Sequence, residues 1–174
     1  MSMLYDVSRL RTGTDRLTRR FEPSEFPVEE EFRLGAPVDL DVEIHKDATK
    51  VRVTGRVGTT LQLDCGRCLE PFDIPLDAAF DALFLPAVAN AGAGELEVAD
   101  EDLGVSFYKD ETLDLAELMR EQFYLALPMK PLCRPDCKGL CPVCGINRNR
   151  ETCTCQTEWT DPRLDALKRL TGRQ

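Results

Sequence analysis

The stretch FDIPLDAAFDALF, residues 72–84, carries an apolar side chain at every second position. Neighbouring side chains of a β-strand point to opposite faces, so this period of two predicts a strand with one buried face. Pro75 lies inside the stretch and cannot donate a backbone hydrogen bond. We therefore expect Pro75 at a sheet edge or at a bulge.

Two segments before this stretch show the same period. Residues 38–45, VDLDVEIH, alternate aliphatic with mostly acidic side chains, and residues 50–65, KVRVTGRVGTTLQLDC, extend the pattern. Gly55 and Gly58 in the second segment predict a bulge or a bend. Together the three segments predict a strongly bent antiparallel sheet or a partly open barrel.

A helical period replaces the strand period in residues 112–127, TLDLAELMREQFYLAL. Thr112 or Asp114 can cap the start of this helix, and Pro128 ends it. Its expected inner face consists of five side chains at helical spacing: Leu115, Leu118, Met119, Gln122 and Leu125. Residues 161–170 predict a shorter C-terminal helix, with Asp161 as its cap. The expected fold class is therefore α+β, with one main helix, a cysteine-rich tail resembling a zinc finger and a short final helix.

The length of 174 residues suits one domain with a small appendage. We expect a single core domain over residues 1–128, with an acidic mobile loop near 87–104, and a cysteine-rich metal-binding tail with the C-terminal helix over 129–174. The apolar runs are too short to cross a bilayer, and charged residues interrupt the first positions before any secretory apolar region forms. These features predict a cytoplasmic protein without a membrane segment.

The formal net charge of −9 argues against a protein that coats nucleic acid indiscriminately. Residues 87–117 contain nine acids and a single lysine, a local charge of −8. Residues 7–20 and residues 130–150 each carry a local charge of +4. The two basic segments can support a limited phosphate contact. The candidate nucleic-acid ligands in them are Arg9, Arg11, Arg16, Arg19, Arg20, Lys138, Arg148 and Arg150.

Six of the eight cysteines fall within residues 133–155. The pentapeptide CPVCG, residues 141–145, has the form of a zinc knuckle, in which two thiolates reach one ion and the glycine lets the backbone turn. We expect a structural Zn²⁺ bound by Cys141 and Cys144 together with a second pair, either Cys153 and Cys155 or Cys133 and Cys137. Zinc would order a tail that has little apolar material of its own and would present basic side chains. In the alternative interpretation these side chains only offset the charge of the thiolates.

The remaining pair, Cys65 and Cys68 in CGRC, allows three interpretations. The spacing is that of thioredoxin-type redox sites, but the flanking segments predict strands, so no helix N-terminus is available to stabilise a thiolate. A second metal half-site is possible, since eight cysteines divide into two sets of four. We favour the third interpretation, a pair of ordinary turn thiols.

No group of residues in the sequence forms a recognisable catalytic site. His45 is the only histidine and falls on the polar side of a strand, and the acids at residues 100–102 lie in a run of small residues. We therefore expect no enzyme and no small-molecule substrate.

Four stretches in order resemble one family: DCGRCLEPF at residues 64–72, LALPMKPLC at 125–133, CKGLCPVCGINRN with the following CTC, and DPRLDALKRL at 161–170. The chain is similar to the YceD family, the large ribosomal RNA subunit accumulation proteins of bacteria and plastids. The similarity covers nearly the whole chain. It implies a non-catalytic role in the accumulation, processing or stability of large-subunit (23S) ribosomal RNA during ribosome biogenesis.

The resemblance and the charge distribution together suggest an adaptor whose partners are large-subunit ribosomal RNA precursor or a ribosomal protein. In this hypothesis the two basic segments face RNA, and the acids at residues 95–102 face a basic partner. Two other functions stay open: a metal-dependent protein-binding module without RNA contact, and a thiol oxidoreductase that uses Cys65 and Cys68.

Overall fold

The computed structural model describes residues 3–10, 12–87 and 105–156. The chain divides into two compact units, one formed by Met1–Leu63 and Pro71–Pro131 and the other by Asp64–Glu70 and Leu132–Gln174. Most of the expected acidic loop near 87–104, and all of the expected C-terminal helix, fall outside the described residues.

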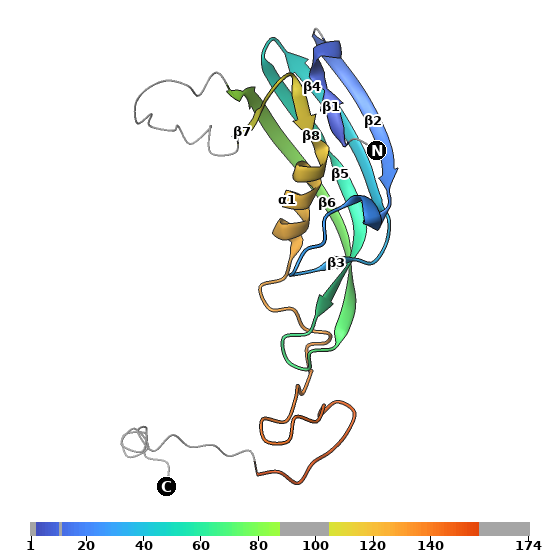
Figure 1. Cartoon of the computed structure of the whole chain (residues 1–174), viewed down its shortest axis with the longest axis vertical. Helices are drawn as coiled ribbons and strands as arrows, with labels where there is room; N and C mark the ends of the chain where they lie inside the picture. The colour runs from blue at the N-terminus through green and yellow to red at the C-terminus, as the bar shows by residue number, and fades with distance from the viewer. Residues whose placement is uncertain (1–2, 11, 88–104, 157–174) are drawn as a thin grey trace, which may run out of the picture. The chain divides into compact units, whose positions relative to one another are not determined.

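The first unit contains a curved sheet (Figure 1). Its strands lie in the order β2 (Gly13–Phe21), β4 (Val38–Asp47), β5 (Lys50–Asp64), β6 (Pro71–Pro86) and β7 (Val105–Tyr108), and β3 (Arg33–Leu34) pairs with β5. A second, two-stranded sheet pairs β1 (Leu4–Asp6) with β8 (Thr112–Asp114). Two short 3₁₀ turns, Val7–Arg9 and Pro23–Glu25, follow β1 and β2.

The sheet is bent and does not close into a barrel, which agrees with the first of the two expected architectures. Strands β2, β4 and β5 pair antiparallel, and within the described residues the edge strands β2 and β7 do not pair with each other. β7 departs from the expected antiparallel arrangement because it pairs parallel to β6, with Leu83 opposite Val105. A parallel neighbour needs a long crossover connection, and the stretch between the two strands supplies that length.

The glycines of β5 do not form a bulge against β4. The β4–β5 register runs without interruption from Asp39 opposite Gly58 to Asp47 opposite Lys50. Gly55 instead permits a close approach, since a Cβ atom there would lie 2.3 Å from the carbonyl oxygen of Asp41. Pro75 lies in the part of β6 that precedes the pairing with β7, which begins at Leu83, and so does not interrupt that ladder.

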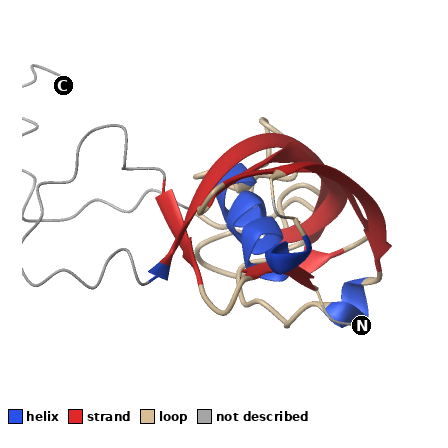
Figure 2. Ribbon diagram, turned by 90° about the horizontal axis from the view of Figure 1, so that it is seen from above, coloured by secondary structure: helices blue, strands red, loops and turns tan. Residues whose placement is uncertain are grey.

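The single helix of the described chain, α1 (Leu115–Ala126), lies inside the curl of the sheet, as Figure 2 shows. Asp114 caps it, because one carboxylate oxygen accepts the N–H groups of Ala116 at 2.9 Å and Glu117 at 3.2 Å. Its buried side chains are Leu115, Leu118, Met119 and Phe123.

One residue of the expected helix face is misplaced. Leu125 is 79% exposed, whereas Phe123, which was outside the expected face, is buried. Phe26 and Phe32, from the segment between β2 and β3, lie against Phe123 with ring centroids 5.8 and 6.0 Å away. These two aromatic rings decide which side of the last helical turn is covered.

The outer face of the sheet carries charges whose sign alternates from strand to strand. β2 and β5 present arginines, β4 and β6 present aspartates, and they form four cross-strand ion pairs: Arg16–Asp41, Arg20–Asp39, Arg52–Asp81 and Arg56–Asp77. Each exposed pair contributes little to stability, but like charges would lie opposite each other if β2 paired with β5 or β4 with β6. The pattern therefore favours the observed order of strands.

Candidate metal centres

The eight cysteines lie in the second unit and form two groups of four. The first group is Cys65, Cys68, Cys133 and Cys137, and the second is Cys141, Cys144, Cys153 and Cys155. Within each group all sulfur atoms lie within 4.8 Å of one another. All eight are free thiols.

The two Cys-x-x-Cys turns have the same backbone structure. The carbonyl oxygen of Cys65 accepts the N–H of Leu69 at 2.9 Å, and that of Cys141 accepts the N–H of Gly145 at 2.9 Å. The residue after the second cysteine is left-handed in both turns, with φ of 58° at Leu69 and 75° at Gly145. The knuckle expected from CPVCG is therefore present twice.

Backbone N–H groups stabilise the thiolate form of the first cysteine in each turn. The N–H groups of Cys144 and Val143 lower the pKa of Cys141 to about 6. Burial raises the pKa of Cys65, but the N–H groups of Cys133, Cys68 and Arg67 outweigh it and bring the value to about 6. Thiolates are the form that binds metal, so the first cysteine of each turn is favoured as a metal ligand.

The distances in the first group fit a tetrahedral metal site. Cys65 Sγ lies 3.8 Å from Cys137 Sγ, and Cys68 Sγ lies 3.7 Å from Cys133 Sγ. A zinc ion with four sulfur ligands at about 2.3 Å has sulfur atoms about 3.8 Å apart, whereas a disulfide needs about 2.05 Å. Three of these cysteines are buried and Cys133 is half-buried, which suits a closed structural site.

The second group is more open to solvent. Cys141 is buried, Cys153 and Cys155 are half-buried, and Cys144 is exposed. The loop between Cys144 and Cys153 folds back on the knuckle, where Cys141 N donates to the carbonyl of Ile146 at 2.8 Å. Four soft thiolate ligands of this kind can hold a zinc ion.

The structure shows which cysteine pairs lie together. Cys153 and Cys155 complete the set begun by Cys141 and Cys144, while Cys133 and Cys137 join Cys65 and Cys68. This grouping favours the second interpretation of Cys65 and Cys68, a metal half-site, over that of ordinary turn thiols. In the sequence, the signal for this second group was that eight cysteines divide into two sets of four. The turn at Cys65 and Cys68 did not look like a knuckle because Leu69 occupies the position that Gly145 has in CPVCG.

In the part of the chain that the structure describes, the second unit buries few side chains apart from its cysteines. Its buried apolar side chains among the described residues are Cys65, Cys68, Cys137 and Cys141, and the aliphatic and aromatic core belongs to the first unit. A metal ion bound in each group would supply order that the few buried apolar side chains do not.

The expected nucleic-acid ligands are in different situations. Arg16 and Arg20 are held by Asp41 and Asp39, and Arg9 lies 3.5 Å from Asp6. Arg150 pairs with Glu70 at 2.6 Å. Arg19, Lys138 and Arg148 are exposed, and no carboxylate among the described residues pairs with them, while Arg11 falls outside the described residues.

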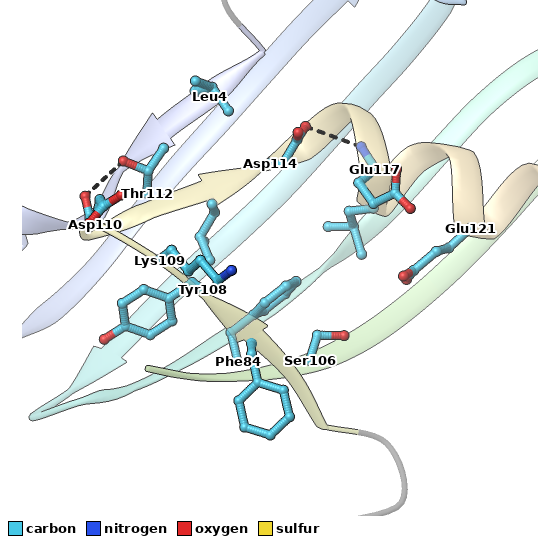
Figure 3. Close-up of a pocket in the computed structure, with 13 residues that line it drawn as sticks. Leu4, Phe84, Ser106, Tyr108, Lys109, Asp110, Thr112, Asp114, Glu117 and Glu121 are labelled. Carbon is cyan, nitrogen blue, oxygen red and sulfur yellow. Dashed lines mark hydrogen bonds between the residues drawn. The ribbon is translucent and has the colours of Figure 1, made fainter. Parts of the chain in front are cut away.

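A groove of about 580 Å³ lies on the first unit between α1, β7 and β8 (Figure 3). Its apolar lining includes Phe84, Phe107 and Leu118. Four carboxylates line it, Asp110, Asp114, Glu117 and Glu121, and Lys109 is the one cation among its described lining residues. Burial, and then the neighbouring Glu117, raise the pKa of Glu121. The groove is suited to attract a positively charged group.

An open sheet curled around one helix, together with a unit that contains two groups of four cysteines, defines a β-rich protein with two candidate metal sites. The chain belongs to the YceD family: the family model "Large ribosomal RNA subunit accumulation protein YceD" matches residues 53–171, which include all eight cysteines.

Curated relatives agree with this membership. An uncharacterized protein of Mycobacterium tuberculosis is 36% identical over 79% of this chain and 64% of its own length. The chloroplastic large ribosomal RNA subunit accumulation protein YCED homolog 1 is 27% identical in Zea mays, over 69% of this chain and 49% of the relative. Its Arabidopsis thaliana counterpart is 25% identical over 95% of this chain and 56% of the relative.

The chain thus spans less than two thirds of each of these relatives. No solved structure gives a significant match. Among the described residues no helix has both the length and the apolar character that crossing a bilayer requires.

Proposed function

We propose that this protein is a non-catalytic factor in the accumulation of large-subunit ribosomal RNA, where it bridges RNA and a ribosomal protein. The observation that carries the proposal is the family match over residues 53–171, supported by the names of the two plant relatives. The cytoplasm is the proposed compartment.

RNA contact is assigned chiefly to the metal-ordered unit. Lys138 and Arg148 are exposed there and have no carboxylate partner among the described residues, so they are available to phosphates. To bind phosphates, Arg16 and Arg20 on β2 would first have to break their ion pairs with Asp41 and Asp39. On the N-terminal segment Arg19 is the better candidate.

The protein partner is assigned to the acidic side of the first unit. The groove beside α1 is lined by four carboxylates, and residues 87–117 carry the local charge of −8. Ribosomal proteins that bind RNA must carry basic surfaces, and a basic surface is complementary to this groove.

Charge reversal in the two basic segments tests the RNA contact. We expect Lys138→Glu with Arg148→Glu to weaken binding to a large-subunit ribosomal RNA precursor and to reduce its salt dependence, because two phosphate contacts are lost. Arg19→Glu, in the N-terminal segment, should have a smaller effect because it removes one phosphate contact. Arg33→Glu, an exposed arginine of β3 outside both segments, is the control. Undiminished association after reversal of both segments would show that RNA is not bound in this way.

A second pair of substitutions tests whether the acidic groove beside α1 binds the protein partner. Glu117→Lys with Glu121→Lys should abolish capture of a basic ribosomal protein while RNA binding persists, and Glu30→Lys, at an exposed acid elsewhere, should not. Capture that survives the double change would remove the groove from the proposal. Protein capture without any RNA binding would favour a metal-dependent protein-binding module instead.

A thiol oxidoreductase is the second candidate, because the pKa of Cys65 is lowered to about 6 while that of Cys68 is raised. Both thiols are nevertheless buried and grouped with Cys133 and Cys137, and the turn is not at a helix N-terminus. A disulfide-reduction assay on zinc-loaded protein distinguishes the two functions, since only an oxidoreductase turns over. Incubation of precursor RNA with magnesium and the purified chain tests for a ribonuclease in the same way.

A further inference from the structure

One side chain connects the two cysteine groups. Asn149 belongs to the loop between Cys144 and Cys153, which joins the two cysteine pairs of the second group. Its amide Nδ2, however, donates a hydrogen bond to Cys137 Sγ of the first group, at 3.3 Å. The residue that supports a sulfur of one site is therefore carried by the loop of the other.

The orientation of this amide is fixed by its remaining contacts. Asn149 Oδ1 accepts the backbone N–H of Lys138 at 2.8 Å and an Nη2–H of Arg134 at 2.7 Å. Asn149 Nδ2 also donates to Asn147 Oδ1 at 2.9 Å. These contacts leave Nδ2, and not Oδ1, facing the sulfur, where only a donor stabilises a thiolate.

The loop reaches the first group by backbone contacts as well. Arg148 N donates to the carbonyl of Gly139 at 2.9 Å, and Leu140 N donates to the carbonyl of Arg67, inside the first knuckle, at 3.0 Å. Gly139 has φ of 70°, and a Cβ atom there would lie 2.9 Å from that same carbonyl oxygen. The loop, residues 138–140 and the knuckle thus form one continuous set of contacts.

We propose that Asn149 is a positioning residue that couples the two metal sites. Metal bound by the second group closes the loop onto its knuckle, which holds the Asn149 amide against Cys137, and this hydrogen bond strengthens metal binding by the first group. Coupling between two binding equilibria is reciprocal, so metal in the first group strengthens the second by the same factor. The inference rests on both groups binding zinc and is independent of the RNA proposal.

Zinc release measures the coupling directly. The full chain, loaded with zinc, is titrated with a competing chelator, native mass spectrometry reports the two-zinc, one-zinc and zinc-free species, and alkylation identifies the released cysteines. Asn149→Ala should weaken zinc binding by the first group about 10–100-fold, the usual effect of removing a hydrogen bond to a ligand. Thr152→Ala, an exposed change in the same loop, is the matched control.

The coupling itself appears when the second group is disabled. In a Cys153→Ser, Cys155→Ser background the first group should already bind weakly, and Asn149→Ala should then add little. Asn149→Asp keeps the contacts to Lys138 and Arg134 but replaces the donor by an oxygen, so it should act like Asn149→Ala even if the latter variant folds poorly.

Three results would overturn the proposal. Zinc binding by the first group that is unchanged in both Asn149 variants would show that the amide does not position the sulfur. An equal loss with and without the second group would show that the loop metal does not hold the amide in place. Fewer than two zinc ions in the unmodified chain would remove the premise itself.

Discussion

Leu69 adopts a backbone conformation that leucine disfavours. It occupies, with φ of 58°, the place in the first knuckle that Gly145 fills in the second. A left-handed conformation costs a non-glycine residue about 1–2 kcal/mol, while a glycine loses about 0.5–1 kcal/mol of extra chain entropy on folding. The leucine is 66% exposed, so it gives little packing in return.

We expect Leu69→Gly to stabilise the second unit by about 0.5 kcal/mol, because relief of the strain exceeds the entropic loss. Gly145→Ala should destabilise it by about 1 kcal/mol for the opposite reason. Chelator midpoints from the zinc-release titration measure both changes. Equal midpoints for all three proteins would mean that the left-handed turns contribute nothing to metal binding.

Gly55 is required for a different reason, the close approach of two strands. A Cβ atom at this position would lie 2.3 Å from Asp41 O and 2.8 Å from Val42 Cα, both on β4. We expect Gly55→Ala to lower the free energy of unfolding by about 2–3 kcal/mol, since the backbone must shift to make room. Gly58→Ala is the control on the same strand, because its nearest atom would be 3.8 Å away. Urea unfolding of both variants compares them, and an equal effect would contradict the explanation.

At the scale of elements, a partly buried carboxylate connects α1 to the segment between β2 and β3. Glu29, with a side chain 12% exposed, accepts from Arg120 Nε at 2.6 Å and from the Tyr124 hydroxyl at 2.7 Å. The Arg120 guanidinium, and then the Tyr124 hydroxyl, lower the pKa of Glu29 below its ordinary value of 4.5. Glu29 in turn raises the pKa of Tyr124 to about 12.

A lowered pKa in the folded state gives this carboxylate a stabilising effect that is present above pH 4.5 and is lost as the pH falls through its folded value. Glu29→Gln should therefore be less stable than the unmodified protein at pH 7, and the difference should shrink under acid. Urea unfolding at pH 7 and pH 4, followed by near-UV circular dichroism, measures it. Glu30→Gln is the exposed control, and a difference for Glu29→Gln that stayed constant with pH would contradict the ion pair.

The elements were predictable where one side chain pattern decides them. Val38, Leu40, Val42 and Ile44 alternate in sequence and are buried in β4, and Asp114 caps α1 as its position suggests. The parallel pairing of β7 and the exposure of Leu125 were not predictable. Both depend on neighbours distant in sequence, β6 for the first and the rings of Phe26 and Phe32 for the second.

At the scale of the whole molecule, the two units should respond differently to metal removal. The first unit has a hydrophobic core, whereas the second buries mainly cysteines among its described residues. We expect chelation to abolish hydrogen-exchange protection in residues 132–156 and to leave β4 and β5 protected. Loss of protection in both units at the same chelator concentration would show that the core also depends on metal.

Zinc stoichiometry is the complementary measurement. The unmodified chain should bind two zinc ions, and Cys65→Ser with Cys68→Ser should bind one, held by Cys141, Cys144, Cys153 and Cys155. Ser106→Ala, a change in the first unit, should leave the number at two. A count of one for the unmodified chain would return Cys65 and Cys68 to the role of turn thiols.

The sequence by itself determined the features that depend on local order: the alternating strands, the capped helix, the CPVCG knuckle and the family. Periodicity and short spacings suffice for these, because the interacting residues are neighbours in the chain. Only the tertiary structure decided which cysteines lie together and which arginines pair with a carboxylate. Cys68 and Cys133 are 65 positions apart and Arg16 and Asp41 are 25 apart, and no local pattern specifies such contacts, which follow from strand pairing and from the packing of distant turns.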